Sequence, residues 1–198
     1  MYERLGRIPA DAPLDDAYVL GDHRIGVEAK NVREWIYPMS GRVWVMIRKC
    51  LEIDAMPLLV CRKVGYLTHA VFSRLGIMAF EVHRQLFSPL VESYLTLIRH
   101  TDHLGYKDVM TADPTQPHPH LVTFLRKTLP AHIETYHERW NAHRELLEYF
   151  AIRLGLGNPK MSDPEREKHY RAFARAVLYP PREEGDDDDR EEGEEEDF

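Results

Sequence analysis

The sequence predicts an α/β fold in which helices flank a mixed central sheet. Two observations carry this prediction. The apolar segments of residues 1–100 follow the order strand–strand–helix–strand–helix–strand. One of them, PLLVCRK at residues 57–63, is a continuous apolar run of the kind that forms buried parallel strands. The length of 198 residues suits one domain with an appendage, and a hydrophobic content of 43% is enough for a core.

The first two strands are predicted at residues 14–20 and 24–30, around the turn sequence Gly21-Asp22-His23. A helix is predicted over residues 40–53. Its apolar residues recur at helical spacing behind a serine cap, Ser40, and they are Val43, Ile47, Cys50 and Leu51. The first part of the core is therefore a hairpin that leads into a helix.

The buried run at residues 57–63 is followed by a predicted helix over residues 66–75, which ends at Gly76. IMAFEV at residues 77–82 is predicted to form a further short strand. Residues 86–100 suggest one more helix, packed on the core.

The second half of the chain predicts mainly helix. Residues 111–120 are rich in proline and indicate a linker or an ordered loop. Apolar residues from Ile133 to Leu154 mark a long amphipathic helix that stops near Gly155 and Gly157. Ser162-Asp163-Pro164-Glu165 begins another helix, with a cap and an early proline in the favoured order.

We therefore divide the chain into a core at residues 1–100, a helical extension at residues 101–181 and an acidic tail at residues 182–198. The tail contains twelve acids and two arginines, and it is expected to be disordered. The remaining residues carry 24 bases against 21 acids, so the body is mildly basic despite the overall net charge of −7. Its charge is compatible with a nucleic-acid partner.

Other features bear on the location of the protein. No apolar run approaches the roughly 18 residues that span a bilayer, and the N-terminus lacks the apolar segment of a signal peptide. Cys50 and Cys61 stand in apolar surroundings without metal-ligand spacing, as reduced core thiols do. We expect a cytoplasmic protein with no membrane partner.

The most informative segment for function is GDHRIGVEAKN, residues 21–31. In a strand, Glu28 and Lys30 project from the same face, since side chains alternate along a strand. Asp15 and Asp16 stand in the preceding strand. A carboxylate pair can hold a hard divalent cation, and a nearby ammonium can orient water or stabilise charge on a phosphate. This pattern fits metal-assisted phosphodiester hydrolysis.

Asp16…Glu28-Ala29-Lys30, followed by a helix, the strand PLLVCRK, a second helix and IMAFEV, resembles the PD-(D/E)XK nuclease superfamily, which includes Holliday-junction resolvases. The resemblance covers roughly residues 1–87. It implies a restriction-endonuclease-like fold and a nuclease that cleaves DNA with Mg²⁺ or Mn²⁺. It also allows a homodimer, since many members dimerise to cut two strands.

Carried over to this sequence, the resemblance implies Asp16 and Glu28 as metal ligands, together with the carbonyl of Ala29. It implies Lys30 as the catalytic lysine. Asp15 competes with Asp16, because a one-residue change of register exchanges the acid that faces the site. Asp16 is favoured because it directly precedes the apolar residues 17–20.

Family members usually begin with a helix before the first strand, and MYERLG is predicted to form the last turns of such a helix, with Gly6 as its stop. Without the family context, the acids and Lys30 would be interpreted as the solvated face of an edge hairpin.

Further polar residues lie close to this site in the predicted topology. Asn31, Arg33, Arg62 and Lys63 are candidate phosphate contacts, because their donors suit phosphate oxygens. The alternative for each is an ordinary surface or loop position. Arg48 and Lys49 are predicted to lie on the solvated face of their helix.

Two functions follow from these features. The first is a metal-dependent deoxyribonuclease. The second is a non-catalytic protein that keeps the nuclease-like core as a scaffold and binds DNA or proteins.

Overall fold

A computed structural model describes the following parts of the chain: the backbone of residues 2–4, and residues 14–113, 115–116, 118–156, 158 and 160–178. The predicted disorder of the tail at residues 182–198 lies outside these residues. The predicted helix stops at Gly6 and Gly157 also lie outside them.

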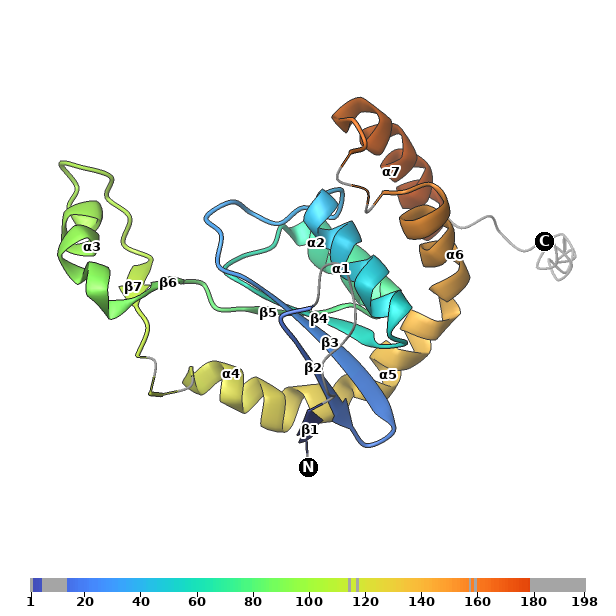
Figure 1. Cartoon of the computed structure of the whole chain (residues 1–198), viewed down its shortest axis with the longest axis horizontal. Helices are drawn as coiled ribbons and strands as arrows, with labels where there is room; N and C mark the ends of the chain where they lie inside the picture. The colour runs from blue at the N-terminus through green and yellow to red at the C-terminus, as the bar shows by residue number, and fades with distance from the viewer. Residues whose placement is uncertain are drawn as a thin grey trace, which may run out of the picture.

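The described strands of the first half form one mixed sheet in the order β1-β2-β3-β4-β5 (Figure 1). β1, β2 and β3 pair antiparallel, whereas β3, β4 and β5 pair parallel. The strand bounds are Tyr2–Arg4 for β1, Asp16–Leu20 for β2, His23–Lys30 for β3, Met56–Cys61 for β4 and Met78–Glu81 for β5. The predicted α/β class is confirmed.

The connections follow the turn residues of the sequence. Gly21 adopts a φ of 61° in the turn between β2 and β3. Helix α1, Gly41–Glu52, joins β3 to β4, and helix α2, Tyr66–Leu75, joins β4 to β5. α2 ends where Gly76 adopts the left-handed conformation, with a φ of 73°, as the sequence predicted.

The two faces of β3 are covered by different helices. The even-numbered face packs against α1, since Lys49 of that helix contacts Glu28. The odd-numbered face turns toward helix α5, Leu129–Ala142, where Glu134 contacts His23 at 2.9 Å. β4 is almost wholly buried between its neighbours. A strand that is covered on both faces has a continuous apolar sequence, which is why the sequence of β4 predicted a buried strand.

Residues Tyr2–Arg4 form strand β1 and not the end of a helix, so this prediction was wrong. The local sequence suits a helical turn, but β2 offers a free edge to which these residues pair in the register Tyr2↔Leu20 to Arg4↔Tyr18. Pairing with a distant strand decides the conformation here, which local sequence does not reveal.

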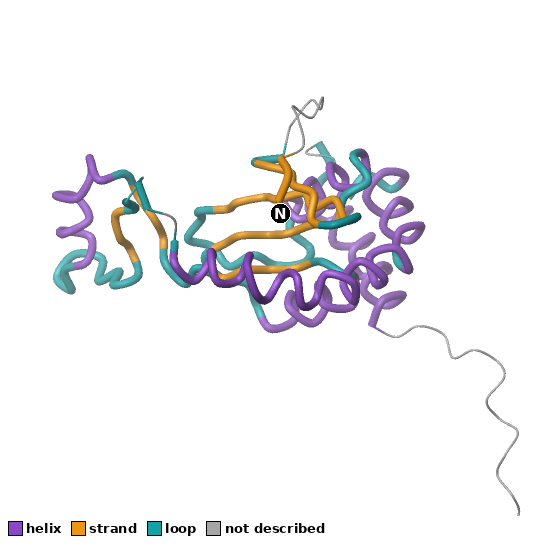
Figure 2. Tube along the Cα trace, turned by 90° about the horizontal axis from the view of Figure 1, so that it is seen from below, coloured by secondary structure: helices purple, strands orange, loops and turns teal. Residues whose placement is uncertain are grey.

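Residues 85–111 form an arm that projects from one end of the sheet (Figures 1 and 2). Its elements are β6, Gln85–Phe87, a 3-10 turn, Pro89–Val91, α3, Glu92–Arg99, and β7, Val109–Thr111. β6 and β7 pair parallel to each other. The prediction of one helix over residues 86–100, packed on the core, was therefore wrong in two respects. Its start is a strand, and α3 packs on β7 within the arm.

The second half is helical and curves around the sheet (Figure 1). α4, Pro119–Thr123, passes through a π-helical segment, Phe124–Thr128, into α5. α6, Arg144–Glu148, continues into a second π-helical segment, Tyr149–Arg153, and α7 spans Asp163–Leu178. This helical run begins before the predicted Ile133, and it ends at the predicted place, where Gly155 has a φ of 69°.

The helical extension shares its core with the sheet. The indole of Trp44 in α1 meets the ring of Phe173 in α7 at a centroid distance of 4.7 Å, and both are fully buried. Cys50 and Cys61 are buried free thiols, as predicted. Burial, followed by the nearby carboxylate of Glu81, raises the pKa of Cys61 to about 12, so this thiol stays protonated at neutral pH.

None of the helices in the described parts of the chain combines the length and the apolar composition that a membrane crossing requires.

Candidate functional site

A buried carboxylate stands at the centre of the predicted site. Glu28 lies near the end of β3 and is only 3% exposed. The Nζ atom of Lys30, on the same face of the strand, forms an ion pair with its Oε1 atom. The Nζ atom of Lys49, from α1, lies 3.4 Å from Oε1 and 3.3 Å from Oε2. Glu28 therefore bridges two ammonium groups.

The prediction that Lys49 faces solvent was wrong, because this side chain is buried at 7% exposure. Lys49 follows Met46 by three residues, so the two share one side of α1, and Met46 is fully buried. The three-residue spacing between Met46 and Lys49 could therefore have indicated in the sequence that Lys49 is buried. Its partner Glu28 was not predictable from α1 alone, since it lies on another element.

A hollow of about 350 Å³ opens beside Glu28. Its walls come from β3, α1 and the segment before and within α7, and its lining residues are Glu28, Lys30, Gly41, Arg42, Val45, Lys49, Asn158 and Arg166. Four of these side chains are cationic and one is anionic. The hollow is therefore suited electrostatically to an anion.

The two arginines of the hollow are held in different ways. Arg166 is fixed by the carbonyls of Asn158 and Met161, at 3.3 and 3.0 Å, and by Asp163 at 2.8 Å. Arg42 pairs with the exposed carboxylate of Glu34 at 3.3 Å. Exposed pairs of this kind are weak, so Arg42 is readily available to a ligand, whereas Arg166 shapes the wall.

The structure brings Asp15, and not Asp16, to the side of Glu28. Asp16 pairs with Val27 in the β2–β3 ladder, so its side chain projects from the face of the sheet opposite to that of Glu28. Its carboxylate contacts the hydroxyl of Tyr18 at 2.5 Å. Asp15 directly precedes β2, and its carboxylate accepts a hydrogen bond at 2.6 Å from the N–H of Ala29, the residue after Glu28.

The oxygen donors near Ala29 suit a hard divalent cation. Asp15, directly before β2, and Glu28 of β3 provide carboxylates. Mg²⁺ is commonly held by one or two carboxylates, with water and phosphate oxygens completing its shell. Among the described residues, no group of three or more His, Cys, Asp or Glu side chains could hold a metal ion. Binding of a cation here would require both carboxylates, and water or phosphate oxygens would complete its coordination shell.

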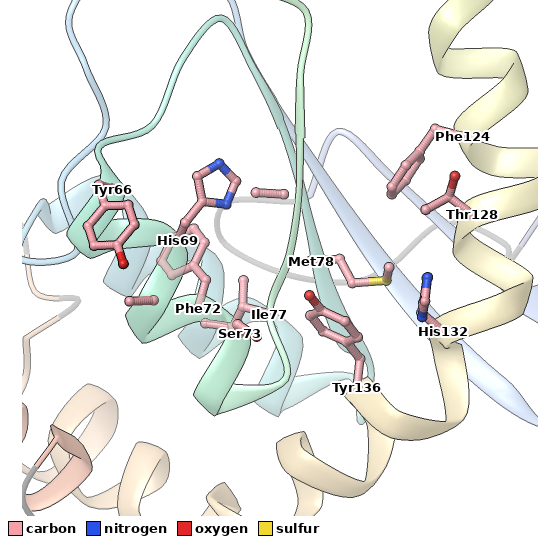
Figure 3. Close-up of a pocket in the computed structure, with 12 residues that line it drawn as sticks. Tyr66, His69, Phe72, Ser73, Ile77, Met78, Phe124, Thr128, His132 and Tyr136 are labelled. Atoms are coloured by element: carbon pink, nitrogen blue, oxygen red, sulfur yellow. The ribbon is translucent and has the colours of Figure 1, made fainter.

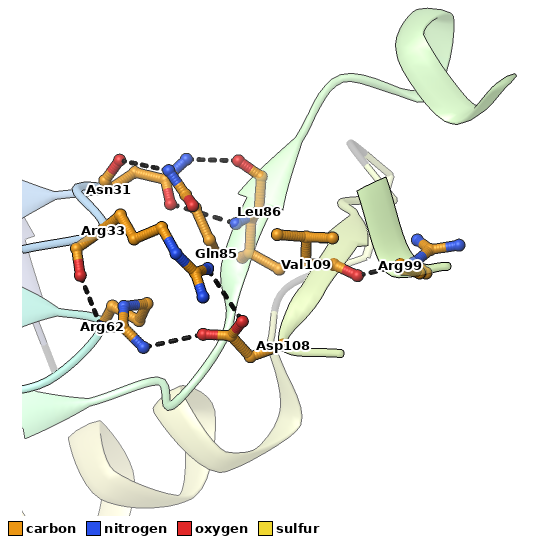
Figure 4. Close-up of polar contacts among 8 residues, drawn as sticks. All are labelled: Asn31, Arg33, Arg62, Gln85, Leu86, Arg99, Asp108 and Val109. Carbon is orange, nitrogen blue, oxygen red and sulfur yellow. Dashed lines mark hydrogen bonds and ion pairs between the residues drawn. The ribbon is translucent and has the colours of Figure 1, made fainter. Parts of the chain in front are cut away.

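Three of the predicted phosphate contacts instead anchor the arm (Figure 4). The side chain of Asn31 binds β6 as a strand would, since it donates to the Leu86 carbonyl and accepts from the Leu86 N–H at 3.0 Å. Arg33 and Arg62 both bind the carboxylate of Asp108, at 2.9 and 2.7 Å. The side-chain N–H groups of Asn31, Arg33 and Arg62 thus form hydrogen bonds within the protein.

Additional contacts strengthen this anchor. Arg62 also donates to the Arg33 carbonyl at 2.5 Å, and the Arg33 guanidinium lies 3.4 Å from the ring centroid of Tyr106. The fourth predicted contact, Lys63, lies over the ring of Trp35 at 4.4 Å. Sequence reasoning missed these roles because Asp108 is 75 residues from Arg33 and 46 from Arg62.

The Asp108 carboxylate is the ionic centre of the anchor. Its partial burial alone would raise its pKa, but the hydrogen bond from Arg33 and the charges of Arg33 and Arg62 outweigh burial and lower the pKa below its usual value. A lowered carboxyl pKa contributes stability above the unfolded value, about 4 for aspartate. This contribution is lost as the pH falls through the folded value.

We expect Asp108→Asn to loosen the arm at neutral pH, because the two arginines lose their carboxylate. Chymotryptic cleavage after the exposed Leu104 should become several-fold faster, and the acid sensitivity of the arm below about pH 4 should diminish. Asp102→Asn is the matched control, since that carboxylate is exposed within the same arm. Equal cleavage rates in the two variants would contradict the anchor.

A second hollow, about 550 Å³, shares no lining residue with the hollow beside Glu28. Figure 3 shows its wall. It is bounded by α2, β5 and the α4–α5 helix, and its wall includes Tyr66, His69, His132 and Tyr136. None of its lining residues in the described parts of the chain carries a carboxylate. The sequence did not predict this hollow, which depends on how α5 crosses α2.

Comparison of the chain with protein-family models, with curated proteins and with solved structures found no match.

Proposed function

We propose that this chain is a metal-dependent nuclease that hydrolyses phosphodiester bonds of DNA on a restriction-endonuclease-like core. The observation that carries the proposal is the buried Glu28 carboxylate between Lys30 and Lys49, in the wall of a cationic hollow. The site lies at the end of β3, in a sheet whose element order agrees with the one that the resemblance implies.

In the proposed mechanism, Asp15 and Glu28 would hold Mg²⁺ or Mn²⁺, together with the carbonyl of Ala29. Such an ion, when bound, polarises the scissile phosphate and lowers the pKa of a coordinated water. Lys30 orients the attacking water or stabilises charge that develops on the phosphate, and the ammonium of Lys49 adds to this stabilisation from the buried side. Arg42, at the rim, suits an adjacent phosphate of the same strand.

The second candidate is a non-catalytic scaffold that binds DNA or a protein. Two observations favour it. Asp16 faces away from Glu28, and the charge of Glu28 is already balanced by two lysines. Calorimetric titration with Mg²⁺ separates the two candidates. A nuclease should show a site that is lost in Asp15→Asn, whereas a scaffold should show none.

The test of the nuclease is cleavage of labelled duplex, single-stranded and branched DNA by the full chain with Mg²⁺ or Mn²⁺. We expect Asp15→Asn and Lys30→Met each to reduce the rate at least about 100-fold, as the loss of one transition-state contact does. Asp16→Asn is the matched control, because its carboxylate leaves the opposite face. It should retain activity within a few-fold.

Two results would count against the proposal. Absence of cleavage on all three DNA forms with either metal would leave the scaffold as the better explanation. Loss of activity in Asp16→Asn with full activity in Asp15→Asn would overturn the assignment of the second carboxylate.

A further inference from the structure

Three aromatic side chains are exposed near the carboxyl edge of the parallel strands, two on the loop after β3 and one at the start of α2. Trp35 and Tyr37, in the loop after β3, are 44% and 55% exposed. Tyr66, directly after the loop that follows β4, is 91% exposed. We call these three residues the aromatic platform. Large aromatic side chains are normally covered in a folded protein, so a group of three exposed ones indicates a binding surface.

The backbone beneath the platform is fixed. Ile36 forms a parallel bridge with Val64, and its N–H donates to the Lys63 carbonyl at 3.2 Å. Its carbonyl accepts a hydrogen bond from the buried Thr68 hydroxyl at 2.9 Å. Because Ile36 is itself buried, its two neighbours in the chain, Trp35 and Tyr37, project outward.

Gly65 brings the two loops together. A Cβ atom at this position would lie 3.8 Å from the Tyr37 ring and 3.9 Å from the Trp35 ring, so both rings border this glycine. Tyr66 is the next residue in the chain. The ammonium of Lys63 lies 4.4 Å from the Trp35 ring centroid, which places a cation against the platform.

The platform is continuous in the chain with the candidate site. The loop that carries Trp35 and Tyr37 begins directly after Lys30 and leads into α1, where Arg42 lines the cationic hollow. Flat apolar rings and the cations Lys63 and Arg42 therefore lie along one edge of the sheet, where Arg42 also pairs with the carboxylate of Glu34. A polyanion whose repeating unit contains a flat ring matches both features, whereas an apolar protein segment matches only the rings.

We propose that the aromatic platform stacks the unpaired bases of a DNA strand whose backbone runs toward Glu28 and Lys30. This inference rests on the proposed function and names its substrate class: DNA with a single-stranded stretch. Bases in a duplex are already stacked on each other and hide their faces, whereas unpaired bases stack on tyrosine and tryptophan without regard to sequence. Lys63 and Arg42 supply the charge that follows the phosphates.

Binding is measured with the full chain and without divalent metal, so that no cleavage is needed. The probes are a labelled oligothymidylate and a duplex of equal length, followed by fluorescence anisotropy. We expect Tyr66→Ala and Trp35→Ala each to weaken binding of the single strand about tenfold, and duplex binding to change less than about twofold. Tyr94→Ala in the arm is the matched control, since it removes a tyrosine that is 66% exposed elsewhere.

A second measurement localises the contact. The sequence holds three tryptophans, and Trp44 and Trp140 are buried, so Trp35 is the one that a ligand in solution can reach. The oligothymidylate should quench tryptophan emission, and Trp35→Phe should remove the quenching.

Equal weakening of single-strand and duplex binding, or no effect of either alanine variant, would overturn the platform. Because binding is scored without metal and cleavage with metal, the two proposals fail separately. Intact cleavage without base stacking would leave the nuclease, and intact stacking without cleavage would leave a single-strand-binding scaffold.

Discussion

Glu28→Ala is expected to lower the free energy of unfolding by about 3–5 kcal/mol, the usual cost of removing one partner from a buried ion pair. The ammonium of Lys49 stays buried by α1 while its carboxylate is removed. Lys30 contributes less, since it is partly exposed and can turn toward water. Urea unfolding followed by circular dichroism measures the change.

The double variant Glu28→Leu/Lys49→Met tests whether charge or packing is responsible. Replacement of a buried ion pair by apolar side chains of similar volume is often neutral. We expect it to recover most of the stability that Glu28→Ala loses. If it is as unstable as Glu28→Ala, packing and not charge accounts for the loss. Glu34→Ala, which removes an exposed carboxylate paired with Arg42, is the surface control and should cost less than about 1 kcal/mol.

The double variant also separates folding from chemistry. It should be stable yet inactive, because it lacks the proposed metal ligand. Glu28→Ala by itself cannot provide that distinction, since an unfolded enzyme is also inactive. Activity in the stable double variant would therefore exclude Glu28 from the proposed mechanism.

Gly76→Ala is the second change with a large expected effect. Gly76 has a φ of 73°, and a Cβ atom there would lie 2.1 Å from the Tyr136 carbonyl oxygen and 2.4 Å from the Trp140 N atom. Both are backbone atoms of α5, which cannot turn aside as a flexible side chain does. We expect a loss of about 3–5 kcal/mol, from the left-handed conformation and the forced separation of α2 from α5.

Gly21→Ala is the matched control for this prediction. Its φ of 61° is similar, but no atom of the described residues lies within 4 Å of the added Cβ. It should cost only the conformational part, about 1–2 kcal/mol. Thermal unfolding should therefore show a much larger decrease in Tm for Gly76→Ala. Equal decreases for the two variants would contradict the close approach of α2 and α5.

Those parts of the fold that depend on local sequence were predictable. Gly21 and Gly76 predict a turn and a helix end because few other residues adopt their positive φ angles, and both predictions were correct. The apolar run of β4 was informative because both faces of that strand are covered. The start of the arm was mispredicted, since the pairing of Leu86 with Met110 depends on a strand more than twenty residues away.

The candidate site was predictable only in part for the same reason. Glu28 and Lys30 lie two residues apart on one strand, so alternation alone placed them together. Lys49 and Arg166 reach the same hollow from other elements, and their approach depends on how α1 and α7 pack. The choice between Asp15 and Asp16 depends on a register that differs by one residue, which composition does not fix.

The attachment of the arm has a mechanical consequence. Asn31 and Arg33, which hold β6 and Asp108, follow Lys30 directly in the chain. A load applied to the arm is therefore transmitted to the end of β3 and to the start of the loop that carries Trp35. The anchor of the arm and the cationic hollow thus share one short stretch of backbone, from Lys30 to Arg33.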